Sequence, residues 1–425
     1  MLKRGLSWTL ACMVGAAATQ ALAESPRSAI FLHPDGMGAN TWNVVRLQQV
    51  GPDGRLAWDR LPKVAMYVGP MLDSVNASSN GGATTHAYGI RAHLGAFGTD
   101  PSGQRPNAAS GRPTTVLQDA MAAGKKVALI NSSSVTEPGT AAFIASVANR
   151  DDEAEIAAQL LAAKPDFLLG GGETFFLPKG TKGRHGEGMR TDGRNLVDEA
   201  RAAGYTVVFT AEELAQVDQS ATRVLGLFAT EETFNELTEE QMTKQGLPPF
   251  QPQAPRFDRM LAFVLERLRD APNGYLVVGN EEGTDNLSGE NNVPATLEAA
   301  AGADRAIALA LEESKRNPAL TLVVCSDSDN GGMNATSDDL DELPLPLGNR
   351  SENGSVLSSD GGKPYLSAPD RRGKQIPYYV VWASNSDMAG GTVARGIGPG
   401  AALIEGTIDS TRIYEVLRFG LFGSD

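Results

Sequence analysis

The segment Ala29-Ile30-Phe31-Leu32-His33-Pro34-Asp35-Gly36-Met37-Gly38 is the stretch of this sequence that decides the fold class. Four consecutive apolar residues are typical of a buried strand, and the polar, glycine-rich residues after them indicate a turn where the strand ends. Seven further apolar runs of similar length follow along the chain: Val127–Ile130, Asp166–Leu169, Thr206–Phe209, Val224–Phe228, Tyr275–Val278, Leu320–Val324 and Tyr378–Trp382. The first run therefore belongs to a series of short, buried strands.

Apolar residues at helical spacing separate several of these runs. The segments that show this spacing are Thr115–Ala123, Ala154–Ala163, Leu196–Ala203, Phe257–Arg269 and Leu297–Ser314. Strands that alternate with helices and are apolar along most of their length are typical of a parallel sheet buried on both faces. The sequence therefore predicts an α/β three-layer sandwich with a large, mostly parallel central sheet covered by helices on both faces.

The domain organisation follows from the absence of internal repeats and of a separating linker. We expect residues 24–425 to form a single catalytic domain. Residues 330–375 break the alternating pattern because they are rich in Gly, Ser, Asp, Asn and Pro. We interpret them as an insertion or lid between two core strands, with a plain surface excursion as the alternative.

The amino terminus predicts export of the protein. Lys3 and Arg4 precede an apolar segment of small residues, and Ala21-Leu22-Ala23 is typical of a signal-peptide cleavage site. We therefore expect residues 1–23 to be a signal peptide and the mature protein to be periplasmic or secreted. Removal of Cys12 would leave Cys325 as the remaining cysteine, so no intramolecular disulfide is expected.

Composition narrows the range of partners. The chain has 51 acidic and 37 basic residues, a formal net charge of −14 and no basic tract. An acidic surface of this kind argues against nucleic-acid or anionic-membrane partners. Beyond the amino-terminal segment, no apolar stretch is long enough to cross a bilayer.

Carboxylates follow several of the predicted strands. They are Asp35 after the first run, Glu137 shortly after Val127–Ile130, Glu281, Glu282 and Asp285 after Tyr275–Val278, and Asp327 after Leu320–Val324. Ligands of open parallel sheets bind outside the carboxyl ends of the strands, so these acids are expected at one edge. Because like charges raise one another's pKa, such a cluster indicates bound divalent cations.

The sequence resembles the alkaline phosphatase family from Asp35-Gly36-Met37-Gly38 onwards. Further matching stretches occur in the family's order: Val147-Ala148-Asn149-Arg150-Asp151 with residues 155–161 after it, Lys164–Gly172, Leu225–Ala229 and Gly398–Ala401, the last of which fits the closing strand of the family. The resemblance implies an alkaline phosphatase-like phosphomonoesterase. In that family a serine at a helix N-terminus attacks phosphorus, the phosphoserine intermediate is hydrolysed, metal ions bind the reacting oxygens and an arginine binds the phosphate.

Residue by residue, the resemblance assigns roles to individual positions. Arg150 is similar to the arginine that binds the non-bridging phosphate oxygens. The implied metal ligands are Asp35 as the bridging carboxylate, Asp327 on the nucleophile side, Asp285 on the leaving-group side, Glu281 or Glu282 at a third site, and Glu137 as another residue that lines the third site.

Two serines compete for the role of nucleophile. Asp73-Ser74 matches the Asp-Ser pair of the family. However, counting back from Gly89-Ile90-Arg91 puts Ser79 at the nucleophile position, with Ser78 in place of the aspartate. We favour Ser79, and the alternative is that both serines are ordinary polar caps.

The chain departs from the family where the family uses histidine as a metal ligand. Ser328 stands beside Asp327, Asp387 stands near the C-terminus, and Gly289 or its neighbours Glu290 and Asn291 follow Asp285. Oxygen ligands suit Mg²⁺, Ca²⁺ or Mn²⁺ better than Zn²⁺. The expected cofactors are therefore two or three of these harder cations, with Zn²⁺ as a possible substitute.

Histidine 33 is a separate case. It precedes Asp35 by two residues and is expected on the same side of the strand. Its role is open between a nitrogen ligand, a contact to a ligand and a structural histidine.

Two rival functions stay open at the level of sequence. One is a degenerate, non-catalytic protein that binds cations or a phosphorylated ligand. The other is a hydrolase of diesters, sulfates or phosphonates on the same fold. The resemblance also implies a possible homodimer.

Overall fold

The computed structural model describes residues 26–337, 356–358 and 363–423 of the 425-residue chain. The segment interpreted as a signal peptide, residues 1–23, lies outside the described residues.

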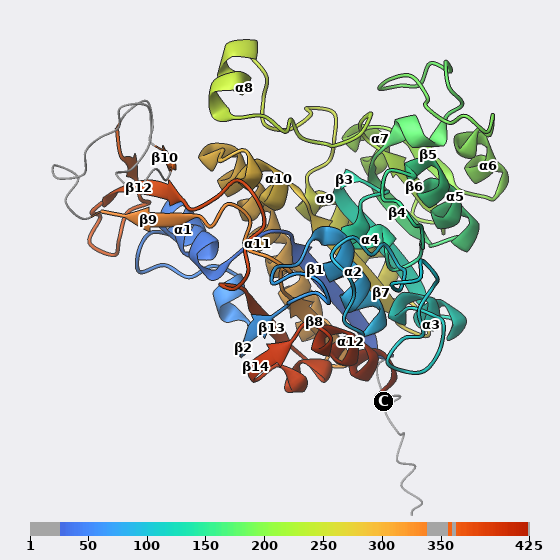
Figure 1. Cartoon of the computed structure of the whole chain (residues 1–425), viewed down its shortest axis with the longest axis horizontal. Helices are drawn as coiled ribbons and strands as arrows, with labels where there is room; N and C mark the ends of the chain where they lie inside the picture. Colours follow the sequence, from blue (N-terminus) through green and yellow to red (C-terminus); the bar gives the residue numbers. More distant parts are fainter. Residues whose placement is uncertain (1–25, 338–355, 359–362, 424–425) are drawn as a thin grey trace, which may run out of the picture.

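A ten-stranded sheet forms the middle layer of the molecule (Figure 1). Its spatial order is β14 (Gly406–Asp409), β2 (Lys63–Val68), β13 (Val393–Ile397), β8 (Leu320–Val324), β1 (Ser28–Pro34), β7 (Tyr275–Glu281), β3 (Lys126–Ser134), β4 (Phe167–Gly171), β6 (Val224–Leu227) and β5 (Thr206–Val208). Strand β13 runs antiparallel to its neighbours β2 and β8, and the other paired strands of this sheet are parallel. The prediction of a large, mostly parallel sheet is confirmed.

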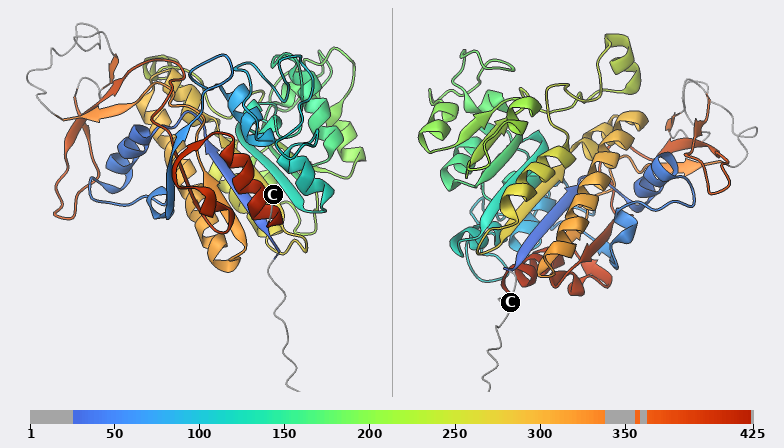
Figure 2. Two further views of the ribbon diagram at one scale, coloured as in Figure 1. Left: turned by 60° about the horizontal axis from the view of Figure 1, so that its bottom comes forward. Right: turned by 180° about the vertical axis from the view of Figure 1, so that it is seen from behind.

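Helices cover both faces of this sheet (Figure 2). One apolar core joins the sheet to α2 (Ser79–Tyr88), α3 (Val116–Ala122), α4 (Pro138–Ala141), α5 (Glu153–Ala163), α6 (Leu196–Ala202) and α12 (Arg412–Phe422). The core on the other face joins it to α1 (Ala39–Val50), the 3-10 turn η1 (Trp58–Arg60), α7 (Ala211–Ala215), α9 (Phe257–Leu268) and α11 (Val293–Arg316). The three-layer arrangement is therefore confirmed.

Strand β1 shows why helices pack on both faces of the sheet. Ala29 and Phe31 belong to one core, whereas Ile30 and Leu32 belong to the other, and all four are almost fully buried. Since side chains alternate along a strand, an apolar run without polar interruption buries both of its sides. The same pattern places β1 at the centre of the sheet, between β8 and β7.

A second, four-stranded antiparallel sheet lies beside α1 at one end of the molecule (Figures 1 and 2). Its strands are β9 (Asn334–Thr336), β10 (Val356–Ser358), β11 (Tyr365–Leu366) and β12 (Pro377–Trp382), and β12 pairs with each of the other three. The remaining short elements are the helices α8 (Glu239–Gln245) and α10 (Gly283–Gly289) and the 3-10 turns η2 (Glu173–Phe176) and η3 (Gly400–Leu403).

The structure corrects three details of the sequence analysis. The run Tyr378–Trp382 is a strand, but it lies in the small sheet and not in the core sheet. The segment 330–375 carries β9, β10 and β11 in its described part. The stretch Gly398–Ala401 follows strand β13 and leads into η3, so it is not itself a strand.

Strands β2, β13 and β14 were not predicted from the sequence. In β2 the residues Val64, Met66 and Val68 are exposed, and only Ala65 and Tyr67 are buried. A strand near the edge of the sheet buries one face, so its sequence lacks the continuous apolar run of a central strand. In the described residues, no helix is both long and apolar enough for a bilayer.

We expect the substitution Phe31→Ala to lower the free energy of unfolding by about 3–5 kcal/mol. Phe31 is fully buried in β1, and its ring lies 5.3 Å from the ring of His86 and 6.0 Å from that of Phe143 (centroid distances). Denaturant unfolding of the purified protein measures the change. Leu72→Ala, at a side chain that is 55% exposed, is the control and should cost less than about 0.5 kcal/mol. Equal losses in both variants would contradict this placement of β1.

Candidate active site

Four carboxylates gather at the carboxyl ends of three adjacent strands. Asp35 follows β1, Glu282 and Asp285 follow β7, and Asp327 follows β8. All four are buried, and several of their oxygens have no hydrogen-bond partner: Asp35 Oδ2, Asp285 Oδ1 and both carboxylate oxygens of Asp327. Buried polar atoms are normally satisfied, so an unpartnered group of this kind indicates a binding site for cations.

The acidity of these groups reflects their crowding. Burial raises the pKa of Asp35, Glu282 and Asp285 well above the usual range, and the charges of neighbouring carboxylates raise it further. For Asp35 these neighbours are Asp327, Glu282 and Asp285. A divalent cation would lower the pKa of all of them, because it stabilises the ionised form.

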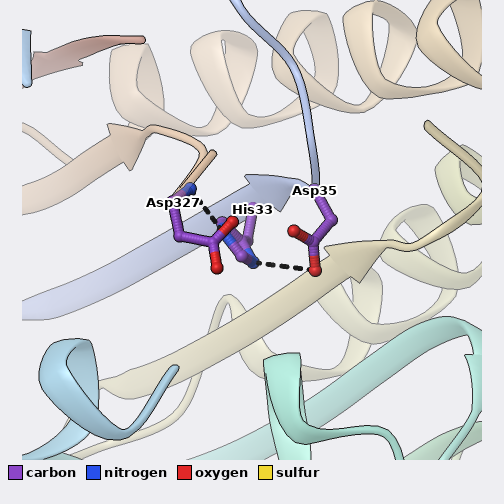
Figure 3. Close-up of side chains that lie close together, drawn as sticks. All are labelled: His33, Asp35 and Asp327. Atoms are coloured by element: carbon purple, nitrogen blue, oxygen red, sulfur yellow. Dashed lines mark hydrogen bonds and ion pairs between the residues drawn. The ribbon is translucent and has the colours of Figure 1, made fainter. Parts of the chain in front are cut away.

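His33 lies between Asp35 and Asp327 (Figure 3): its Nδ1 is 3.7 Å from Oδ2 of Asp35, and its Nε2 is 3.6 Å from Oδ1 of Asp327. Nε2 accepts a hydrogen bond from the backbone N–H of Asp327 at 3.1 Å. Nδ1 lies 2.7 Å from Oδ1 of Asn280, whose Nδ2 donates to Glu282. Both ring nitrogens are thus used by protein groups, and His33, Asp35 and Asp327 would hold a cation together only if one of these hydrogen bonds were released.

Helix α2 brings its N-terminus to the same point. The helix begins at Ser79, and the hydroxyl of Ser78 caps it by accepting a hydrogen bond from the N–H of Gly81 at 3.4 Å. A Cβ atom on Gly82 would lie 2.3 Å from Oδ2 of Asp327, so only glycine lets the first turn approach this carboxylate. In the described part of the chain, the hydroxyl of Ser79 has no hydrogen-bond partner.

Ser74 is held in a different way. Its hydroxyl donates to Oδ1 of Asn76 at 2.9 Å, and the preceding Asp73 accepts from the backbone N–H of Leu94 at 2.8 Å. Asp73 also forms an ion pair with His93, with 3.2 Å between Oδ2 and Nδ1. The side chains of Asp73 and Ser74 are therefore engaged in hydrogen bonds within loops. Ser79, in contrast, lies at a helix N-terminus, where an anion is favoured.

Arg150 and Glu137 form an ion pair at the edge of the cluster. Nη2 of Arg150 donates to Oε2 of Glu137 at 2.9 Å, and the Arg150 side chain is 46% exposed. Glu137 precedes helix α4, and the charge of Glu282 also acts on Arg150. The guanidinium is thus oriented by Glu137 and open to an incoming anion.

On the other side of the cluster, Ser328 and Asp387 are hydrogen-bonded. The Ser328 hydroxyl donates to Oδ1 of Asp387 at 2.6 Å. Burial, and then the charge of Asp327, raises the pKa of Asp387 to about 6. After burial, the charge of Asp387 is the largest cause of the raised pKa of Asp285.

Glu281 does not join the cluster. Its carboxylate lies near the position of a Cβ on Gly283 and near Gly302 of α11, and Arg256 is the charge that lowers its pKa. Burial nevertheless raises that pKa to about 7. Because side chains alternate along β7, Asn280 faces His33 and Glu281 faces the opposite side of the sheet. Of the two glutamates left open by the sequence, Glu282 is the one beside Asp35.

The sequence analysis missed several polar residues that build the site. Asn280 orients His33 and Glu282, and the hydroxyl of Ser132 accepts from the backbone N–H groups of Glu282 at 2.8 Å and Gly283 at 3.3 Å. Asn330 is buried two residues after Ser328, and its Oδ1 has no partner. Asn280 and Ser132 lie near the ends of β7 and β3, and that position was the available signal, whereas Asn330 lies in the polar turn that follows β8.

A cavity of about 490 Å³ is lined by acids whose charges interact with that of Glu137. Its lining includes His185, Thr230, Glu231, Glu232, Phe234 and Glu236. Burial raises the pKa of Glu232 to about 7, and burial together with the charges of Glu137, Glu231 and Glu232 raises that of Glu153 to about 8. The negative potential of the cluster therefore extends into this cavity.

In comparisons with known proteins, the chain is similar to phosphatases. A sequence model described as alkaline phosphatase matches residues 27–345. The chain is 30% identical over 340 residues to the streptomycin-6-phosphate phosphatase of Streptomyces griseus, which covers 71% of this chain and 73% of that protein. It is 27% identical over 341 residues to the repressible alkaline phosphatase of Saccharomyces cerevisiae, covering 74% of this chain but only 57% of the yeast protein.

Solved structures show the same fold. The alkaline phosphatase of Thermus thermophilus superposes with a TM-score of 0.72 at 21% identity, and the superposition covers 97% of this chain and 96% of that one. The similarity thus extends beyond the segment matched by sequence.

We expect the acids beside the cavity to make the cation-free protein less stable as pH rises. The pKa of Glu153 is raised in the folded state, so the folded protein holds this proton more tightly than the unfolded chain does. The free energy of unfolding should therefore fall between about pH 4.5 and about pH 8. Glu153→Gln should reduce this slope in denaturant unfolding, whereas the exposed Glu155→Gln in the same helical turn should not. Equal slopes in both variants would contradict the assignment.

Proposed function

Because the chain belongs to the alkaline phosphatase family, we propose that it hydrolyses phosphate monoesters with Ser79 as nucleophile and divalent cations as cofactors. The observation that carries this proposal is the approach of the Ser79 helix to Asp327, which is possible only with glycine at position 82. It brings a hydroxyl without a partner to the edge of a buried carboxylate cluster. A protein that only binds ligands does not need this arrangement.

Different residues would bind the phosphate and attack it. Arg150 would bind two non-bridging oxygens of the phosphate, in the orientation set by Glu137. The Ser79 oxygen would attack phosphorus while the bond to the alcohol oxygen breaks, and the alcohol would leave with a proton. Water would then attack the phosphoserine, which releases inorganic phosphate and restores the serine. The N-terminus of α2 would favour the negative charge throughout.

The cluster fits divalent cations because several of its buried carboxylate oxygens, on Asp35, Asp285 and Asp327, lack protein partners. The residues that would hold them are Asp35, Glu282, Asp285, Asp327 and Asp387, with Ser328 and Glu137 beside them. When bound, the cations would stabilise the charge on the attacking and leaving oxygens. In the described part of the chain, this donor set is made of oxygens, which favours Mg²⁺, Ca²⁺ or Mn²⁺ over Zn²⁺.

The histidines support the same choice of metal. Both ring nitrogens of His33 are engaged, and Nε2 of His185 lies 2.9 Å from a backbone oxygen. Nε2 of His86 lies 2.7 Å from the Tyr67 hydroxyl, and the Nδ1 of this ring is buried without a partner. Burial lowers the pKa of His86 to about 3, so this ring stays neutral. His93 pairs with Asp73 in the loop described above.

We also propose that the protein acts outside the cytoplasm, in the periplasm or after secretion. The support is the amino-terminal segment 1–23, whose composition is typical of a signal peptide.

We expect Ser79→Ala to lower kcat/KM for an aryl phosphate by about 10³-fold or more, because it removes the attacking oxygen. Ser74→Ala is the matched control and should retain most of the activity. Acid quenching followed by peptide mass spectrometry should find phosphate on Ser79 in the wild-type protein. Phosphate on Ser74 would reverse the assignment, and full activity of Ser79→Ala would refute the mechanism.

We expect the metal-free protein to regain activity with Mg²⁺, Ca²⁺ or Mn²⁺ and much less with Zn²⁺. The measurement is aryl-phosphate hydrolysis after dialysis against a chelator and addition of one metal at a time. Full activity with Zn²⁺ alone would contradict the oxygen-ligand assignment.

A further inference from the structure

Asn330 lies in the turn after β8, next to the carboxylate cluster. The residue is 6% exposed, and its backbone N–H donates to the carbonyl oxygen of Gly36 at 2.8 Å. A Cβ atom on Gly36 would lie 2.8 Å from Cβ of Asn330 and 2.3 Å from Oδ1 of Asp285. The side chains of Asn330 and Asp285 therefore meet over the same glycine.

The carboxamide of Asn330 has an oxygen that the protein does not use. Oδ1 is buried and lacks a hydrogen-bond partner, as does Oδ1 of Asp285. Asp387 accepts a hydrogen bond from the hydroxyl of Ser328, two residues before Asn330, at 2.6 Å, so a second carboxylate lies beside this turn. Two buried oxygens without a partner thus lie near one point beside Gly36, and leaving them unsatisfied costs stability. A cation at that point would remove this cost.

The positions around Asn330 leave the space beside the carboxylates to its side chain. Gly289 has no side chain, and it is one of the positions where the family has a histidine ligand. A Cβ atom on Gly289 would lie 3.7 Å from both Oδ1 and Nδ2 of Asn330. The amide of Asn291 donates instead to the backbone oxygens of Ser288 at 3.0 Å and Ser384 at 2.9 Å. The Asn330 carboxamide is therefore the side chain that occupies the space beside Gly289.

We propose that Oδ1 of Asn330, together with Asp285 and Asp387, binds the divalent cation on the leaving-group side of the site. This inference rests on the proposed function, because it assigns one ligand of the cations invoked there. A neutral amide oxygen in place of an imidazole nitrogen favours a hard cation, as at sites built from carboxylate and carbonyl oxygens.

The test measures cation binding directly. Calorimetric titration and elemental analysis with Mg²⁺, Ca²⁺ and Mn²⁺ give the number and affinity of the ions bound by the full-length chain. Asn330→Ala should lose one ion or weaken its binding by about 10–100-fold, while the remaining ions bind as in the wild-type protein. Asn330→Asp should keep that ion, and Asn330→His should raise the affinity for Zn²⁺. Asn334→Ala, at an exposed asparagine on β9, is the matched control.

The outcomes separate this inference from the proposed function. Wild-type affinity and stoichiometry in Asn330→Ala, shown to be folded by circular dichroism, would overturn the inference alone. Loss of the ion in Asn291→Ala but not in Asn330→Ala would move the ligand to Asn291 and also overturn it. A wild-type protein that binds the cations but hydrolyses no phosphate ester would refute the function and leave the ligand assignment intact. A wild-type protein that binds none of these cations would refute both.

Discussion

The repulsion between buried carboxylates is the constraint on which the site depends. Asp35, Glu282, Asp285 and Asp327 lie within one buried cluster, and two unit charges 4 Å apart repel by about 4 kcal/mol even at an effective dielectric constant of 20. A fold of ordinary stability cannot absorb several such terms. The carboxylates must therefore be partly protonated or be neutralised by cations.

Around the cluster, hydroxyl and backbone groups hold the carboxylate-bearing segments in place and leave several carboxylate oxygens without a hydrogen bond. The Thr284 hydroxyl donates to the carbonyl oxygen of Asp35, and the Ser132 hydroxyl accepts from the N–H groups that follow β7. Gly36 has a φ of +64°, which favours glycine, and its missing side chain also makes room for Asp285. Neutral groups thus fix the geometry, and the carboxylate oxygens face one another. This arrangement destabilises the empty site and stabilises the cation-bound one.

The sequence predicted the strands whose apolar run matches a central, fully buried place in the sheet. Central strands such as β1 and β7 are buried on both faces, so their apolar runs and the acids after them could be read directly. Strand β2 could not, because it exposes alternate residues near the edge of the sheet. The strand character of Tyr378–Trp382 was predicted, but its place in the small sheet was not, since an apolar run does not specify its neighbours.

Within the site, a similar limit applies to Glu281, Glu282 and Asn330. Glu281 and Glu282 are identical in type and adjacent in sequence, and only the direction of the β7 pleat shows which of them faces Asp35. Asn330 gave no signal, because a single asparagine in a polar turn is common. A carboxylate in place of a neutral imidazole, as at Asp387, also makes the site more negative than a histidine-containing one. A phosphate dianion would then meet stronger repulsion without cations, so substrate binding becomes more strictly coupled to cation binding. On the proposed set of ligands, the replacement therefore changes the charge balance of the site as well as the metal that it favours.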